Sequence, residues 1–381
     1  MKEIINSLVS AARSGNMKIV DAVLKTTPQA AEHWQPIMTA AFEGHVEIVK
    51  TLLEHGANAN VVSKNNYRHR PLHRVLEHKK TIPKGKGHLE TVRVLLESGA
   101  SLTARGGHSQ MSPVCLAAVG GETQFIPILL QHLDTWDIFT ASALGEFDRA
   151  KDLLDKSPDL VETLDVNRWR PMNYCCGSRV GCENPSKADQ IIAIVKMLRE
   201  RGAAIDKPPH PLASAVGKLP IMALLLKLGA NPNHGIINAA WSNDFKSVEL
   251  LLDTGADMSR RVVDDTVSEL VQFGMYRMAE LFVDRGANVN GTDNHQGRTM
   301  LHWAALRGAN LKFVGFLLDL GADCAVTDHD GATPLQLAKL RERKKIVDFV
   351  DVGINSKKQA LRAHMPFFAE MAKSENPRIK I

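Results

Sequence analysis

The residues of this chain best suited to metal chemistry are one acidic run and a set of cysteines. Asp328-His329-Asp330 places a single histidine between two carboxylates, which makes a weak metal site at best. Cys115, Cys175, Cys176 and Cys182 could form a metal cluster, but the sequence contains no C-x-x-C pair and no histidines at zinc spacing. We therefore expect these thiols to act as small buried side chains and predict no metal site and no cofactor.

Sequence signatures of catalysis are also missing. The chain contains no phosphate-binding loop, no nucleotide-binding glycine fingerprint and no nucleophile elbow. We therefore predict that the protein is not an enzyme, that it has no catalytic residues, and that its function depends on a binding surface.

A recurring dipeptide organises the elements that would carry such a surface. Gly-Ala closes seven apolar helical runs, and its last four intervals are 27, 26, 31 and 35 residues. Self-similarity at such a period indicates a solenoid of stacked repeats. The dipeptides begin at Gly56, Gly99, Gly202, Gly229, Gly255, Gly286 and Gly321.

The clearest repeat unit spans residues 36–60. Pro36 suits the first turn of a helix, where its missing N–H has no partner to lose, and Gly44 suits the end of that helix. Apolar residues at i, i+3, i+4 spacing within 48–53 then predict a second helix, which Gly56 closes.

This unit resembles the ankyrin repeat, whose pattern is roughly T-P-L-H-x-A-A, a Gly, a V-x-x-L-L run and then G-A-x-x-N. The first motif recurs at Arg70-Pro71-Leu72-His73, Thr299-Met300-Leu301-His302-Trp303-Ala304-Ala305 and Ala332-Thr333-Pro334-Leu335. The resemblance implies an all-α solenoid of about eleven stacked ankyrin-type helix-turn-helix repeats with short β-hairpin loops. Units ending near Pro28 and Pro158 lack the Gly-Ala cap and look like those of many bacterial ankyrin proteins.

The same resemblance predicts the roles of several histidines and the domain layout. His45, His73 and His302 lie at family-typical positions, where they are expected to hydrogen-bond within or between repeats. The solenoid is predicted over residues 1–355, with insertions near 79–88 and 177–189 that should project from the same edge. Residues 356–381 are predicted to form a C-terminal capping helix and tail, with a docking peptide for another protein as the alternative.

The sequence also bears on location and assembly. No stretch approaches the 18 or more uncharged apolar residues of a membrane span, and the first residues lack the apolar run of a secretory signal. We expect a cytoplasmic protein, and a monomeric one.

Positive charge is concentrated in two segments, residues 64–88 and 339–381, although the net charge of the chain is only +5. Residues 64–88 contain eight Lys or Arg against Glu77 alone, a local charge of +7. The insertion within this segment is a basic loop that could contact an acidic protein, phosphate or nucleic acid. Nucleic acid is disfavoured because the chain shows no aromatic interleaving and no recognisable module. The basic loop carries Lys79, Lys80, Lys84 and Lys86.

In the ankyrin family, hairpin tips and the exposed side of each first helix form the concave binding surface. Aromatic and arginine side chains dominate such interfaces. The alternative is that these aromatics only pack against adjacent hairpins. By register, the first helices contribute Phe42, Arg74, Glu77, His78, Tyr174, Trp241, Phe273, Trp303 and Arg307, and the hairpin tips contribute Tyr67, Arg68, His69, Arg105, His108 and Trp169.

The sequence thus predicts a non-catalytic scaffold for protein–protein interaction that binds a partner protein on its concave face. An inhibitor or effector that blocks a target enzyme or host protein is one alternative. Polyanion or nucleic-acid contact through residues 64–88 is another.

Overall fold

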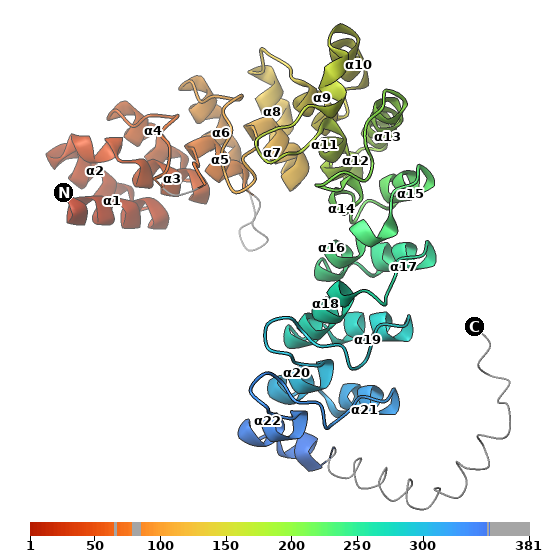
Figure 1. The fold of residues 1–381 in the computed structure, drawn as a ribbon. Coiled ribbons are helices and arrows are strands. Elements are labelled where there is room, and N and C mark those ends of the chain that lie inside the picture. The colour runs from red at the N-terminus through yellow and green to blue at the C-terminus, as the bar shows by residue number, and fades with distance from the viewer. Residues whose placement is uncertain (65–66, 78–84, 349, 351–381) are drawn as a thin grey trace, which may run out of the picture. The chain divides into compact units, whose positions relative to one another are not determined.

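The computed structural model describes residues 1–64, 67–77, 85–348 and 350. Within these ranges the fold is built from pairs of short helices, which confirms the predicted all-α solenoid architecture (Figure 1). The chain divides into two compact units, residues Met1–His234 and the part from Gly235 onward. The predicted capping helix at 356–381 falls outside the described residues.

In the N-terminal unit, a first and a second helix alternate along the chain. The first helices contact one another in succession, and each packs against its own second helix. The first helices are α1 (Lys2–Ser14), α3 (Trp34–Glu43), α5 (Pro71–Leu76), α7 (Pro113–Gly120), α9 (Ile138–Leu144), α11 (Pro171–Gly177) and α14 (Pro211–Ser214). The second helices are α2 (Met17–Thr26), α4 (Val46–Glu54), α6 (Lys86–Glu97), α8 (Ile126–Gln131), α10 (Phe147–Lys156), α13 (Pro185–Glu200) and α15 (Leu219–Lys227).

The same alternation builds the C-terminal unit. Its first helices, which also contact one another in succession, are α16 (Ile236–Trp241), α18 (Arg261–Gln272), α20 (Met300–Arg307) and α22 (Pro334–Leu340). Its second helices are α17 (Phe245–Asp253), α19 (Tyr276–Asp284) and α21 (Leu311–Asp319).

Short 3₁₀ turns and loops complete the repeats. The 3₁₀ turns are η1 (Pro28–Glu32), η2 (Thr123–Phe125), η3 (Pro158–Glu162) and η4 (Pro232–His234). The predicted β-hairpin loops form no strand in the described ranges, and their pairing is limited to isolated antiparallel bridges, Gly106 with Met111 and Thr292 with Thr299. No helix in the described part of the chain combines the length and apolarity that a bilayer crossing requires.

The local sequence signals explain where the helices begin and end. At α22, Thr333 forms a capping box with Gln336, whose side chain accepts a hydrogen bond from the Thr333 amide at 2.8 Å. At the end of α21, Gly321 adopts φ 90°, a left-handed conformation that favours glycine. The Ala322 amide can then donate to the Leu317 carbonyl at 2.9 Å, which closes the helix.

Histidines link consecutive repeats. The Nε2 of His302 lies 3.1 Å from the Ala332 carbonyl, and the Nε2 of His73 lies 3.1 Å from the Met111 carbonyl. His45 contacts the Arg13 carbonyl at 3.2 Å. These contacts confirm the expectation that the three family-typical histidines hydrogen-bond within or between repeats, and all three of these contacts join different repeats.

Asparagines at the end of the G-A-x-x-N motif form a second link. The Asn60 side chain donates to the Gly99 carbonyl at 2.7 Å and accepts from the Ser101 amide at 2.8 Å. Asn290 makes the same pair of bonds to the repeat that follows it. Its side chain donates to the Gly321 carbonyl and accepts from the Asp323 amide. The motif therefore satisfies backbone groups of the following repeat.

The second insertion begins inside the stack and continues into a short, mostly exposed helix. Gly177 ends α11, Ser178 is buried and donates to the Ala143 carbonyl at 2.6 Å, and residues Val180–Glu183 form α12. Asn184 then caps α13 by accepting from the Lys187 amide at 3.2 Å. Most of the first insertion lies outside the described residues.

Candidate partner-binding surface

A pocket of about 500 Å³ lies across three consecutive first helices of the N-terminal unit. It begins at α1, crosses α3 and reaches α5, and the loops before α5 and α7 form its rim. Its lining residues are Val9, Arg13, Trp34, Gln35, Met38, Thr39, Phe42, Glu43, Ser63, Tyr67, His69, Arg74 and His108. Five of them, Phe42, Tyr67, His69, Arg74 and His108, belong to the surface predicted from the sequence.

The centre of this pocket combines apolar surface with a positive side chain. Met38 and Phe42 are nearly buried, whereas Trp34 is half-buried. The guanidinium of Arg74 lies over the Phe42 ring, 4.3 Å from its centroid, a cation–π arrangement. The guanidinium also reaches Glu77 Oε2 at 2.5 Å. Arg13 is exposed at the α1 end.

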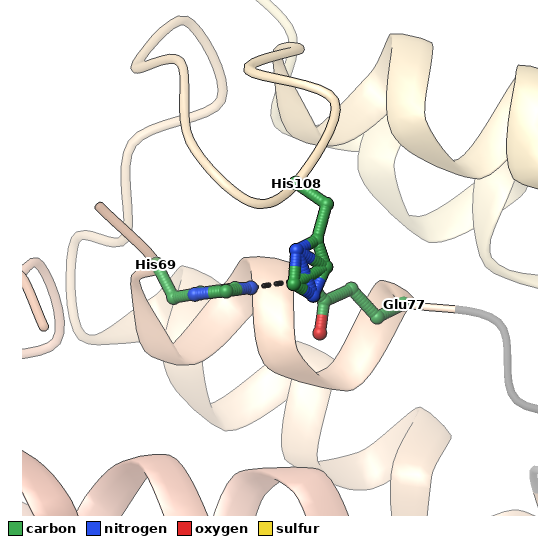
Figure 2. A group of neighbouring side chains, drawn as sticks. All are labelled: His69, Glu77 and His108. Atoms are coloured by element: carbon green, nitrogen blue, oxygen red, sulfur yellow. Dashed lines mark hydrogen bonds and ion pairs between the residues drawn. The ribbon is translucent and has the colours of Figure 1, made fainter. Parts of the chain in front are cut away.

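The rim of the pocket holds a group of three titratable side chains, His69, Glu77 and His108 (Figure 2). His69 is buried and its Nε2 hydrogen-bonds to Glu77 Oε1, whereas His108 is exposed. The two imidazole rings are nearly perpendicular, with centroids 5.2 Å apart and an interplanar angle of 88°. Tyr67, 46% exposed, meets the His108 ring edge-on at 3.9 Å.

Backbone hydrogen bonds hold this rim in place. The Ser63 side chain accepts from the His69 amide at 2.9 Å, and the Ser63 amide donates to the His69 carbonyl at 2.8 Å. Gln110 joins the two loops because its side chain donates to the Tyr67 carbonyl at 2.8 Å. The loops that present His69 and His108 are therefore tied together.

Burial and charge set the protonation of this region. Burial alone would raise the pKa of Glu77, but hydrogen bonds and charge from His69 and Arg74 outweigh it and lower the pKa below its ordinary value. Burial lowers the pKa of His73, one turn along α5, to about 4. Glu77 is thus held as a carboxylate and His73 as a neutral imidazole at neutral pH.

Four predicted binding residues have structural contacts instead. Tyr174 is fully buried, so the expectation that its ring is exposed is wrong. Its hydroxyl donates to Asp165 at 2.7 Å, and Arg105 contacts both the hydroxyl at 3.2 Å and the same carboxylate at 3.3 Å. Half-buried Trp169 packs edge-on against Tyr174. Trp303 is only 7% exposed and its indole N–H donates to Asp293 at 2.9 Å.

Burial of Tyr174 and Trp303 has a physical cause. Each ring occupies the space between its own hairpin and the first helix, and each polar atom reaches an aspartate of that hairpin. Phe42 is also mostly covered, at 7% exposure, although it lines the pocket beneath Arg74. The expectation that the aromatic side chains of the first helices are exposed therefore does not hold in general.

Other predicted residues are exposed but are not among those that line the pocket. Trp241 and Phe273, 39% and 63% exposed, pack edge-on at 5.5 Å in the C-terminal unit, and Arg307 is exposed at the end of α20. Arg68 is exposed beside Tyr67 in the N-terminal unit, and Lys86 begins α6. The other predicted residues, His78, Lys79, Lys80 and Lys84, lie outside the described residues.

The residues first considered for metal chemistry are engaged otherwise. Asp328 accepts hydrogen bonds from Arg298 at 2.9 Å and from the Ala332 amide at 2.9 Å, and its pKa is lowered because these bonds outweigh its burial. Cys115, Cys175 and Cys176 are buried free thiols, and Cys182 is exposed. The grouping of His69, Glu77 and His108 escaped spacing arguments because its members come from three separate segments.

The fold is a stack of helix pairs with side-chain links between repeats, and an open pocket crosses the first helices. These features define a helical repeat protein with an interaction surface. A family model for ankyrin repeats, described as three copies, matches residues 8–106 and 268–359, which together make up half of the chain. The chain belongs to the ankyrin repeat family.

Three relatives match this chain, each through only part of its own length. The chain is 26% identical over 369 residues to the ankyrin repeat and KH domain-containing protein mask-1 of Caenorhabditis elegans, covering 91% of this chain and 11% of that protein. It is 25% identical over 251 residues to palmitoyltransferase ZDHHC17 of Danio rerio, covering 59% and 38%. It is 31% identical over 90 residues to ankyrin repeat domain-containing protein 40 of Mus musculus, covering 24% of each.

The chain thus spans less than two fifths of the length of each of these relatives. The palmitoyltransferase match comes through the ankyrin region of that protein. Ankyrin repeat proteins are generally non-catalytic, and the shared repeats indicate a role in protein–protein interaction.

Proposed function

We propose that this protein binds a segment of another protein, without catalysis, in the pocket that crosses α1, α3 and α5. The pocket of about 500 Å³ is the observation that carries the proposal. It supplies apolar surface from Trp34, Met38 and Phe42, and such surface favours burial of an apolar partner side chain.

The charges around the pocket favour a partner segment that carries carboxylates beside this apolar residue. Among the described residues that line the pocket, Arg13 and Arg74 are cationic and Glu43 is acidic, and Arg74 also pairs with Glu77 at the rim. The surrounding segment 64–88 carries a charge of +7, which would steer an acidic partner toward this unit. Specificity would then come from the combination of an apolar anchor and flanking negative charge.

A displayed library of random peptides, selected on the full chain, tests the proposal. Selected peptides should be enriched in an apolar residue next to Asp or Glu, and their dissociation constants would be measured by fluorescence anisotropy. Trp34→Ala should weaken binding at least about tenfold, since a buried interface aromatic commonly contributes more than 1.4 kcal/mol.

The matched control is Trp241→Ala, which removes a half-exposed tryptophan from the C-terminal unit. Thermal unfolding of both variants separates loss of binding from loss of fold. Thr39→Glu adds a like charge to the pocket without creating a cavity, and it should weaken acidic peptides as well. Peptides whose affinity depends on Trp241 and not on Trp34 or Thr39 would contradict the proposal.

A further inference from the structure

The three side chains at the pocket rim have the composition of a metal site. His69, Glu77 and His108 each offer one ligand atom, and these atoms all lie within 4.8 Å of one another. Two imidazoles and one carboxylate suit a divalent transition-metal ion, since Zn²⁺ is commonly bound by His nitrogen and Glu oxygen at about 2.0–2.2 Å. Figure 2 shows the three side chains converging from different segments.

The geometry of the rings and of the carboxylate suits one shared ion. An imidazole nitrogen donates its lone pair in the plane of its ring, so rings at 88° to each other can direct two lone pairs to a common point. On Glu77, Arg74 holds Oε2 at 2.5 Å, while Oε1 faces His69. The ion pair therefore orients the carboxylate and directs the other oxygen toward the histidines, as outer partners of metal ligands commonly do.

The scaffold around the three residues is organised before any ion binds. Ser63 fixes the His69 loop because its side chain accepts from the His69 amide and its amide donates to the His69 carbonyl. Gly106 and Met111 pair across the His108 loop, and Gln110 ties the loops together. Glu77 directly follows α5. Ligands held by neighbouring backbone lose little freedom on binding, and an exposed His108 leaves the position accessible to ions from solution.

A second group in the same unit meets the same distance criterion but not the same geometry. Asp206, His210 and His234 also offer ligand atoms within 4.8 Å of one another. The His210 and His234 rings, however, are stacked at 3.5 Å with an interplanar angle of 18°, so their lone pairs lie in two nearly parallel planes that do not readily meet at one point. Asp206 Oδ1 already accepts from the Asn231 amide at 3.0 Å. This group serves better as an internal control than as a site.

We propose that His69, Glu77 and His108 bind a divalent transition-metal ion of the zinc class at the pocket rim. The ion would replace the hydrogen bond between His69 and Glu77, and the neutral His69 ring would ligate through Nε2 while it carries its proton on Nδ1. Three protein ligands leave a fourth tetrahedral position for water. Because His69 and His108 belong to consecutive hairpins, the ion would also join two repeats.

Calorimetric titration of the chelator-treated full chain with zinc chloride tests this inference. The wild type should bind one zinc ion, and this binding should depend on His108. His108→Ala should weaken binding by more than about 100-fold, since loss of even an outer partner of a metal ligand typically costs 10–100-fold. His108 is exposed, so this variant should retain the melting temperature of the zinc-free wild type.

The control His234→Ala disrupts only the stacked group and should leave zinc affinity unchanged. Zinc should also raise the melting temperature of the wild type and of His234→Ala, but not that of His108→Ala, since an ion that binds only the folded state stabilises it. The inference is overturned if the wild type binds no zinc, if His108→Ala binds zinc as the wild type does, or if His234→Ala removes binding.

Discussion

The guanidinium of Arg74 lies 4.3 Å above the Phe42 ring and thereby joins α5 to α3 across the repeat boundary. The same guanidinium holds Glu77 at 2.5 Å. One arginine therefore supports both the apolar centre of the pocket and the rim group of His69, Glu77 and His108. The proposed partner surface and the proposed metal site share this support, although each can be tested without the other.

Tyr174→Phe should lower stability without removing a contact surface. The substitution deletes a hydroxyl that donates at 2.7 Å to Asp165, whose side chain is fully buried. Loss of a buried hydrogen bond to a charged group costs about 1.5–3 kcal/mol. The matched control is Tyr276→Phe, because the Tyr276 hydroxyl has no hydrogen-bond partner among the described residues. Urea unfolding that shifts equally for both variants would refute the structural role of Tyr174.

Asn290→Ala should loosen the link to the next repeat. The Asn290 side chain accepts from the Asp323 amide at 2.8 Å, so removing it exposes that amide to solvent exchange. A loss of about 1 kcal/mol corresponds to roughly fivefold faster exchange. Hydrogen exchange of the peptide containing Asp323 measures this change. Asn238→Ala, an exposed helical position, should leave exchange at Asp323 unchanged, and equal rates in Asn290→Ala and wild type would contradict the link.

His302 should make the protein less stable as the pH falls below neutrality. Burial lowers the pKa of His302 from its ordinary value of 6.5, an effect that Arg298 reinforces and that the Ala332 carbonyl, Asp328 and Asp293 oppose. The His302 side chain therefore binds a proton more readily in the unfolded chain than in the folded chain. Stability is lost as the pH drops from about 6.5 toward the folded-state pKa.

The measurement for His302 is the unfolding free energy of wild type and His302→Gln between pH 7.5 and 5. Glutamine cannot titrate but can still donate a hydrogen bond. The wild type should lose more stability on acidification than the variant does. Parallel pH profiles would show that His302 does not contribute.

Thiol reactivity should separate the buried cysteines from the exposed one. Burial raises the pKa of Cys115 and of Cys175 to about 12, and it raises the pKa of Cys176 as well. Because the thiolate is the nucleophile, alkylation at pH 8 should modify exposed Cys182 first and these three only in denaturant. Mass spectrometry identifies the labelled peptides. Labelling of Cys175 at the rate of Cys182 would contradict the packing of α11.

The fold could be predicted from the sequence because its determinants are local. The Gly-Ala caps, the proline at the start of many first helices and the apolar spacing of second helices each act within a few residues. The second insertion also carried a local signal, since Asn184 followed by Pro185 is a helix start. The repeat pattern alone predicts a loop at this point, because the pattern is interrupted there, and it does not indicate the helix start.

The candidate site could be predicted only in part, because burial depends on residues distant in sequence. The Tyr174 position alone does not reveal that Asp165 and Arg105 will cover its hydroxyl. His69, Glu77 and His108 were each identified as surface positions. Their grouping requires the knowledge that the hairpin tips of consecutive repeats lie side by side, which the insertion between them obscures in the sequence.

Crosslinking of a selected acidic peptide tests the central claim most directly. A photoreactive phenylalanine analogue would replace Tyr67 at the pocket rim or, as the control, exposed Ile19 on α2, which does not line the pocket. The account predicts that peptide is captured from position 67 and not from position 19, and that Trp34→Ala strongly reduces capture at peptide concentrations below the dissociation constant. Capture from position 19, or capture from position 67 that is undiminished in Trp34→Ala, would contradict binding in this pocket.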